Sequence, residues 1–136
     1  KVYCIMGDGE QNEGQVWEAA MFASHNKLSN LCIIIEENKI QIDGYTKDIL
    51  NSEPLDKKYK AFNFMVIKID GNDHRKLYKA IQRFKNYKGD KPTVILANTI
   101  AGKGLRSIEN KVSAHGQPIT KNDINEFLEY NKVIEN

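Results

Sequence analysis

Apolar and polar positions fall into blocks along this chain, and the blocks predict strands that alternate with helices. Four short runs are almost entirely apolar or β-branched, as is typical of parallel strands covered on both faces; they span residues 2–6, 31–37, 64–69 and 93–98. Segments with apolar residues at helical spacing lie between and after them, at 13–27, 55–62, 74–88 and beyond Thr120. This order favours an α/β fold with three layers, a largely parallel sheet flanked by helices.

Two segments lack a clear period. Residues 45–53 are polar and irregular, so we predict a surface loop. Residues 99–116 have little periodicity, and a loop of that length in a compact domain is usually functional or mobile. Thr120 and Asp123 have the spacing of a capping box at the start of the last helix, whose predicted apolar stripe contains Ile124, Phe127 and Leu128.

The composition is that of an ordinary globular protein, with 136 residues, 40% of them hydrophobic and 28% charged. We expect residues 1–136 to form a single domain. The net charge of +2 gives no reason to expect nucleic acid or a membrane surface as a partner, and no apolar run approaches the roughly 20 residues of a membrane span. Cys4 and Cys32 lie in predicted strands without zinc-motif spacing, which indicates two reduced core thiols in a cytoplasmic protein.

Polar residues follow the ends of three predicted strands. Asp8 follows the first strand, Asn38 the second, and the loop that carries Lys103 and His115 follows the fourth. Ligands of an open parallel sheet bind beyond the carboxyl ends of its strands, so these groups project from one edge. Carboxylate and amide oxygens suit Mg²⁺ or Ca²⁺. A single carboxylate leaves a divalent cation with a charge of about +1, which can still hold a diphosphate.

Glycines flank the acidic turn. Gly7 and Gly9 allow positive φ and a close approach of backbone to ligand, and the N-terminus of the following helix favours an anion. Gly14 is a poor helix former, so its place near the helix start indicates close packing or a ligand. The chain has no GxxxxGK[ST] or GxSxG motif, and Asn12 stands where GxGxxG requires its third glycine.

The spacing between the Gly-Asp-Gly turn and Asn38 resembles the thiamine-diphosphate signature, and longer stretches resemble the transketolase family. The stretches similar to the N-terminal, diphosphate-binding domain of transketolase are MGDGEQNEGQVWEAAMFAS, NLCIIIEENKIQIDGYTKDI, IDGND, TIAGKG and HGQP. They extend from Met6 to Pro118. Because Lys1 directly precedes a predicted core strand, we expect a C-terminal portion of that domain, incomplete at its N-terminus.

The resemblance implies thiamine diphosphate and Mg²⁺ as cofactors, with Ca²⁺ or Mn²⁺ as possible substitutes, and it implies a role for each matching residue. The metal ligands would be the side chains of Asp8 and Asn38 and the backbone carbonyl of Ile40. His115 would contact the diphosphate region, and Glu13 and Glu18 would face a partner subunit. The implied catalytic residues are His115 and Glu13. The implied cofactor-binding residues are Gly7, Asp8, Gly9, Glu13, Asn38, Ile40, Ile42 and His115.

Two departures limit what the resemblance implies. Glu36 and Glu37 stand where the family usually has aspartates. The role of Lys103 stays open, since it either reaches for phosphate or lies in a flexible turn. The family's further histidines and its pyrimidine-binding domain do not occur in these residues. The resemblance therefore implies part of an enzyme that transfers a two-carbon ketol unit between sugar phosphates, active only with a pyrimidine-binding domain or subunit, as a homodimer or heterotetramer. The alternatives are an enzyme like deoxyxylulose-phosphate synthase, another thiamine-diphosphate enzyme, or a non-catalytic binding or assembly module.

Overall fold

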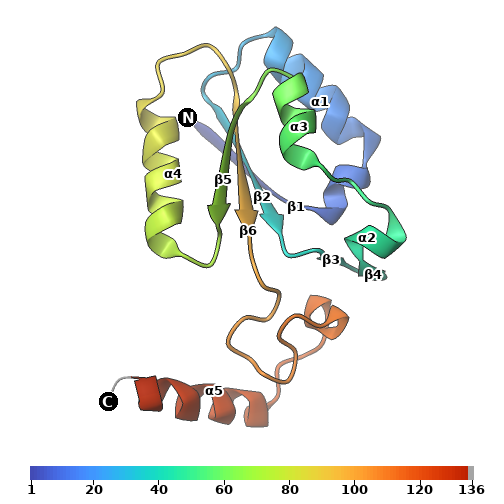
Figure 1. Ribbon diagram of the computed structural model, residues 1–136, viewed down its shortest axis with the longest axis vertical. Coiled ribbons are helices and arrows are strands. Elements are labelled where there is room, and N and C mark those ends of the chain that lie inside the picture. Colours follow the sequence, from blue (N-terminus) through green and yellow to red (C-terminus); the bar gives the residue numbers. More distant parts are fainter. Residues whose placement is uncertain (135–136) are drawn as a thin grey trace.

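Four parallel strands form the centre of the computed structural model, which describes residues 1–134 (Figure 1). Their order in the sheet is β1-β2-β6-β5, and their bounds are Val2–Gly7, Leu31–Glu37, Thr93–Asn98 and Met65–Asp70. One face of the sheet carries α1 (Gly14–His25) and α3 (Leu55–Ala61), and the other carries α4 (His74–Asn86). The predicted three-layer α/β fold with a parallel sheet is confirmed.

Small elements occupy the segments between these layers. A short antiparallel hairpin and a helical turn follow β2, namely β3 (Ile40–Gln41), β4 (Gly44–Tyr45) and α2 (Thr46–Ile49). The prediction of an irregular loop at 45–53 is therefore wrong over its first half. Thr46 is buried and its N–H donates to the Lys39 carbonyl at 3.0 Å, a tertiary contact that polar composition does not reveal. Two 3₁₀ helices complete the set, η1 (Gly9–Asn12) and η2 (Val112–His115).

Two apolar clusters hold the layers together. On the face of α1 and α3, the small side chains of Ala20 and Ala23 let α1 approach β2 closely, and Tyr59 of α3 is fully buried. On the face of α4, Phe84 is also fully buried and packs against β5 and β6. Burial of an aromatic side chain of this kind stabilises the fold by about 1.5–3 kcal/mol.

Strand β1 differs from its prediction as a strand covered on both faces. Tyr3 and Ile5 are 44% and 74% exposed, and Cys4 is exposed as well. The prediction of two core thiols is thus wrong for Cys4 and confirmed for Cys32, where burial raises the pKa of the thiol to about 11. β1 lies at the edge of the described sheet, and α4 lies nearer the opposite edge (Figure 1). A run of apolar residues does not distinguish an edge strand from a central one.

Helix α5 (Lys121–Ile134) lies apart from the sheet (Figure 1). The predicted capping box is present, because the Thr120 N–H donates to Asp123 Oδ2 at 2.8 Å and the Asp123 N–H donates to Thr120 Oγ1 at 3.2 Å. The predicted stripe of Ile124, Phe127 and Leu128 remains 41–50% exposed. The helix instead contacts the segment that follows β6, where Arg106 lies 4.9 Å from the Tyr130 ring. None of the described helices is long and apolar enough to cross a membrane.

Candidate functional site

The turn after β1 directs a buried carboxylate toward the end of β2. Asp8 is 3% exposed, and its Oδ2 accepts the Lys39 N–H at 2.7 Å. Its own N–H donates to the Glu36 carbonyl at 3.1 Å, which continues the pairing of β1 with β2. Lys39 adopts the left-handed region with φ of 66°, unusual for a residue other than glycine. The backbone beside Asn38 therefore turns toward Asp8.

The amide oxygen of Asn38, after β2, and the backbone carbonyl oxygen of Ile40, at the start of β3, point to the same side. Asn38 Oδ1 accepts the Ile40 N–H at 2.8 Å. Ile40 and Tyr45 lie opposite each other in the hairpin as a pair that exchanges no hydrogen bonds. The adjacent pair is hydrogen-bonded instead, because the Thr46 N–H donates to the Lys39 carbonyl. In such a pair the N–H and carbonyl of a residue point away from the partner strand. The Ile40 carbonyl thus points to the side of the Asn38 side chain.

These residues line a cleft of about 520 Å³ that also receives Glu13 from the start of α1 and His115 from η2. The cleft contains no lysine or arginine in the described part of the chain, while five carboxylates line it: Asp8, Glu10, Glu13, Glu36 and Asp43. Ile42 borders it with 79% of its surface exposed. All eight residues that the sequence assigns to the cofactor therefore meet in one cleft.

Burial makes the charge of Asp8 costly. The pKa of Asp8 is raised because burial desolvates the carboxylate, and the hydrogen bond from the Lys39 N–H opposes this only partly. Among the described residues, no three His, Cys, Asp or Glu side chains gather into a metal-binding group. The three predicted ligands offer one carboxylate, one amide and one carbonyl oxygen, a hard-oxygen set that fits Mg²⁺ or Ca²⁺. The donor chemistry is compatible with the predicted metal.

The turn itself approaches β3 closely at Gly9. A Cβ atom at Gly9 would lie 2.9 Å from Gln41 Cβ, closer than real contacts allow. Positive φ is not the reason for glycine here, because the described glycines with positive φ are Gly44, Gly102 and Gly104. Gly14 has open space where its Cβ would lie, so the prediction of close packing there is wrong within this chain.

A buried frame that sequence reasoning missed supports the turn. Gln11 is 2% exposed; its Nε2 donates to the Gly7 carbonyl at 3.1 Å, and its Oε1 accepts the Tyr59 hydroxyl at 2.8 Å. Trp17 Nε1 donates to the Gln11 carbonyl at 2.9 Å. Burial raises the pKa of the Tyr59 phenol, which therefore stays a donor. The only sequence signal for this frame is a glutamine close to an acidic turn, which does not reveal its burial.

Three residues considered from sequence lie outside the cleft. Lys103 lies in a different groove with Glu37, and Glu18 is exposed on α1. Glu36 borders the cleft and accepts a hydrogen bond from the Thr99 hydroxyl, whereas Glu37 points into the groove toward Lys39, 3.6 Å away. The two adjacent glutamates thus face different surfaces, as residues of a strand do.

Comparison with known proteins shows which family this chain belongs to. Residues 1–131 match the family model described as transketolase, thiamine diphosphate binding domain. The chain is 45% identical over 120 residues to the 6-deoxy-6-sulfo-D-fructose transketolase subunit SqwG of Clostridium sp. (strain MSTE9), a match that covers 88% of this chain and 43% of that protein. It is 36% identical over 129 residues to human transketolase, which covers 95% of this chain and 20% of that enzyme.

The same relation holds for solved structures. The crystal structure of transketolase from Campylobacter jejuni superposes with a TM-score of 0.89 at 33% identity, over 97% of this chain and 20% of that one. The chain thus spans less than half the length of these relatives. Family match, sequence identity and fold agree over nearly all of its residues, and the chain belongs to the transketolase family, within the thiamine-diphosphate-binding domain.

Proposed function

We propose that this chain holds the magnesium-diphosphate end of thiamine diphosphate in a transketolase-type enzyme. The observation that carries the proposal is the charge of the cleft, which has a buried carboxylate at its centre and no lysine or arginine among its described lining residues. A diphosphate cannot approach five carboxylates without a cation between them. A divalent cation on Asp8 supplies that charge, and the family supplies the diphosphate.

Each residue then has a role that its position supports. Asp8 and Asn38 hold the cation through their side chains and Ile40 through its carbonyl, which points to the side of Asn38. Gly9 lets the turn pass close to β3, and Gly7 and Gly9 line the cleft on the side of the turn that would face the diphosphate. Ile42 presents an exposed apolar surface to the cofactor.

His115 and Glu13 lie at the rim of the same cleft and are exposed. At the rim, His115 can donate to a diphosphate oxygen or contact a substrate that enters the cleft. Glu13 immediately precedes α1 without making a side-chain cap, so its carboxylate is available to a group outside this chain. We assign Glu13 to the contact with the pyrimidine-binding partner, and Glu18, one turn further along α1, to the same surface.

The reaction that this site serves is the transfer of a two-carbon ketol unit between sugar phosphates. Bound thiamine diphosphate supplies the nucleophilic carbon of that transfer. The chain itself binds and orients the diphosphate end, and a pyrimidine-binding domain or subunit completes the site, in a homodimer or heterotetramer. The relatives described above are transketolases or a transketolase subunit, which favours this function over one like deoxyxylulose-phosphate synthase. The intact set of Asp8, Asn38 and His115 in one cleft favours it over a non-catalytic module.

Removal of the metal tests the proposal. Calorimetric titration of the complete enzyme with thiamine diphosphate should show strong binding in Mg²⁺ and almost none after chelation, and Ca²⁺ or Mn²⁺ should restore it. Affinity that is the same with and without a divalent cation would refute the metal assignment. In the same assay series, this chain without its partner should show no ketol transfer from a ketose phosphate, and measurable turnover would refute the dependence on a partner.

A further inference from the structure

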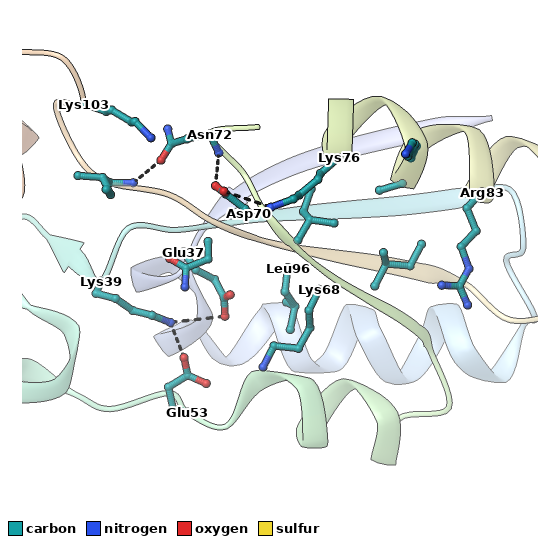
Figure 2. Close-up of a pocket in the computed structure, with 16 residues that line it drawn as sticks. Glu37, Lys39, Glu53, Lys68, Asp70, Asn72, Lys76, Arg83, Leu96 and Lys103 are labelled. Atoms are coloured by element: carbon teal, nitrogen blue, oxygen red, sulfur yellow. Dashed lines mark hydrogen bonds and ion pairs between the residues drawn. The ribbon is translucent and has the colours of Figure 1, made fainter. Parts of the chain in front are cut away.

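A second hollow, of about 980 Å³, lies along β5 between α4 and the segment after β2 (Figure 2). Its floor includes Ile67, Lys68 and Ile69 of β5, and α4 contributes one wall. The opposite wall carries Lys39 and Glu53. We call this hollow the β5 groove. It shares none of its lining residues with the cleft around Asp8, which we call the cofactor cleft after its proposed function.

The outer edge of β5 is open for backbone pairing. β5 is the last strand of the described sheet and pairs only with β6 there. The Met65 N–H donates to the Pro92 carbonyl at 2.9 Å and the Gly71 N–H donates to the Asn98 carbonyl at 2.7 Å, so the odd-numbered residues face β6. Because backbone groups alternate in direction along a strand, Val66 and Lys68 direct their N–H and carbonyl groups outward. Asp70 directs its N–H outward, while its carbonyl accepts the Asp73 N–H at 3.3 Å.

The walls of this open edge are cationic. Six basic residues line the groove against three acidic ones, Glu37, Glu53 and Asp70; the basic ones are Lys39, Lys68, Lys76, Lys79, Arg83 and Lys103. Lys39 pairs with Glu37 and Glu53, and Lys76 pairs with Asp70 and Asp73. The Lys68 ammonium lies 3.9 Å from Asp56 on the other side of the strand. Lys79, Arg83 and Lys103 make no ion pair with any residue that the structure describes. Three cations therefore remain available to an anionic occupant.

The spacing of the cations matches an extended chain. Lys76, Lys79 and Arg83 lie on the groove side of α4, at helical spacing of three and four residues. They span about 10 Å along the helix, at roughly 1.5 Å per residue. The outward backbone groups from Val66 to Asp70 span about 13 Å, at roughly 3.3 Å per residue. A short strand laid along β5 would meet α4 cations over most of its length.

We propose that the β5 groove binds an extended acidic segment of a partner protein, which adds to the sheet as a strand beside β5. Main-chain hydrogen bonds to Val66, Lys68 and the N–H of Asp70 provide the pairing, and the unpaired cations select acidic side chains. A second copy of the same edge is disfavoured, because it would bring Lys68 of two chains together. A lysine in the middle of an edge strand commonly prevents such pairing, and the same lysine favours an acidic strand.

Fluorescence anisotropy of a labelled eight-residue peptide with alternating Glu and Thr, titrated with the complete protein, tests this proposal. The acidic peptide should bind, and a peptide with Lys in place of Glu should not. The double variant K79E/R83E should weaken binding roughly ten-fold or more at low salt and leave Mg²⁺-thiamine diphosphate affinity unchanged. Absence of binding to the acidic peptide would overturn the proposal.

A matched pair of variants separates strand addition from adsorption of a polyanion. Lys68→Thr and Lys68→Pro both remove the charge, but only proline removes the outward N–H, at an edge position that tolerates it. Thermal unfolding of the two variants checks that both fold. Strand addition predicts that Lys68→Pro binds the peptide roughly five- to ten-fold more weakly than Lys68→Thr. Equal binding by the two variants would leave only electrostatic attraction and would overturn the proposal.

Discussion

The cofactor cleft and the β5 groove border the same sheet, yet their charges are opposite. Five carboxylates and no lysine or arginine line the cleft, whereas six basic and three acidic residues line the groove. Each contains one buried carboxylate, Asp8 in the cleft and Glu37 in the groove. Glu37 has a cation of this chain beside it, the Lys39 ammonium at 3.6 Å.

The difference shows how two sites on one sheet can treat anions in different ways. Under the proposed function, the cleft repels an anion until a metal binds to Asp8, so a metal complex is selected over a free phosphate. The groove attracts an anion directly through side chains that water screens, so its binding is weaker and more sensitive to salt. Lys39 lies between the two sites, because its N–H donates to Asp8 and its ammonium pairs with Glu37 and Glu53.

The largest expected effect comes from removal of the charge of Asp8. Asp8→Asn in the complete enzyme should weaken Mg²⁺-dependent binding of thiamine diphosphate by roughly 100-fold or more, since loss of a supporting residue alone costs 10–100-fold at metal sites. Asp43→Asn makes the same change in charge at an exposed position of the same cleft and should have little effect. Calorimetric titration measures both. Equal losses would mean that the total charge of the cleft matters and that Asp8 is no ligand.

A smaller effect is expected from crowding at the turn. Gly9→Ala places a Cβ 2.9 Å from Gln41 Cβ and should destabilise the fold by about 1–3 kcal/mol. Gly14→Ala, where no atom lies within 4 Å, should be neutral or stabilising by up to about 1 kcal/mol. Chemical denaturation compares the two. The double variant G9A/Q41G should recover part of the loss, and failure to do so would contradict the steric explanation.

The smallest expected effect concerns the pH dependence of stability that arises from Glu37, the buried carboxylate of the groove. Burial, the largest cause, raises the pKa of Glu37 above its ordinary value of 4.5, while Lys39 lowers it. A raised pKa in the folded state gives a stabilising contribution that is complete below pH 4.5 and is lost as the pH rises through the folded value. The stability of the wild type relative to Glu37→Gln should therefore decrease as the pH rises from about 4 toward 7. Urea denaturation across this range measures it, and an increase would contradict the assignment.

Most of the fold was predictable because apolar periodicity is a local property. The four strands and the helices α1, α3 and α4 match their predicted segments within a few residues. The exposure of β1 was not predictable, since a run from Val2 to Met6 looks the same in a central strand and at an edge. The exposed stripe of α5 has the same cause: its period indicates a helix, but not whether another surface covers it.

Some residues of the candidate site were likewise predictable from the sequence, and others were not. Asp8, Asn38 and the loop that carries His115 could be placed at one edge because parallel strands end there, whereas the role of His115 came only from the resemblance to a family. Buried Gln11 and half-buried Gln41 were missed, because a glutamine that packs against a turn has no periodic or motif signal. The separation of Lys103 from His115 was missed as well, since both lie in one segment without regular structure.

The sequence by itself determined the order of strands and helices, the acidic turn at Asp8, the position of Asn38 at the end of the next strand and the family, because these depend on residue type and spacing. Only the tertiary structure decided that Lys39 turns its backbone to Asp8 and its side chain to Glu37. It also decided that buried Gln11 supports the turn through a hydrogen bond to the Gly7 carbonyl, and that β5 keeps an open cationic edge. These features depend on contacts between segments far apart in the chain, whose directions follow from packing and not from any local pattern.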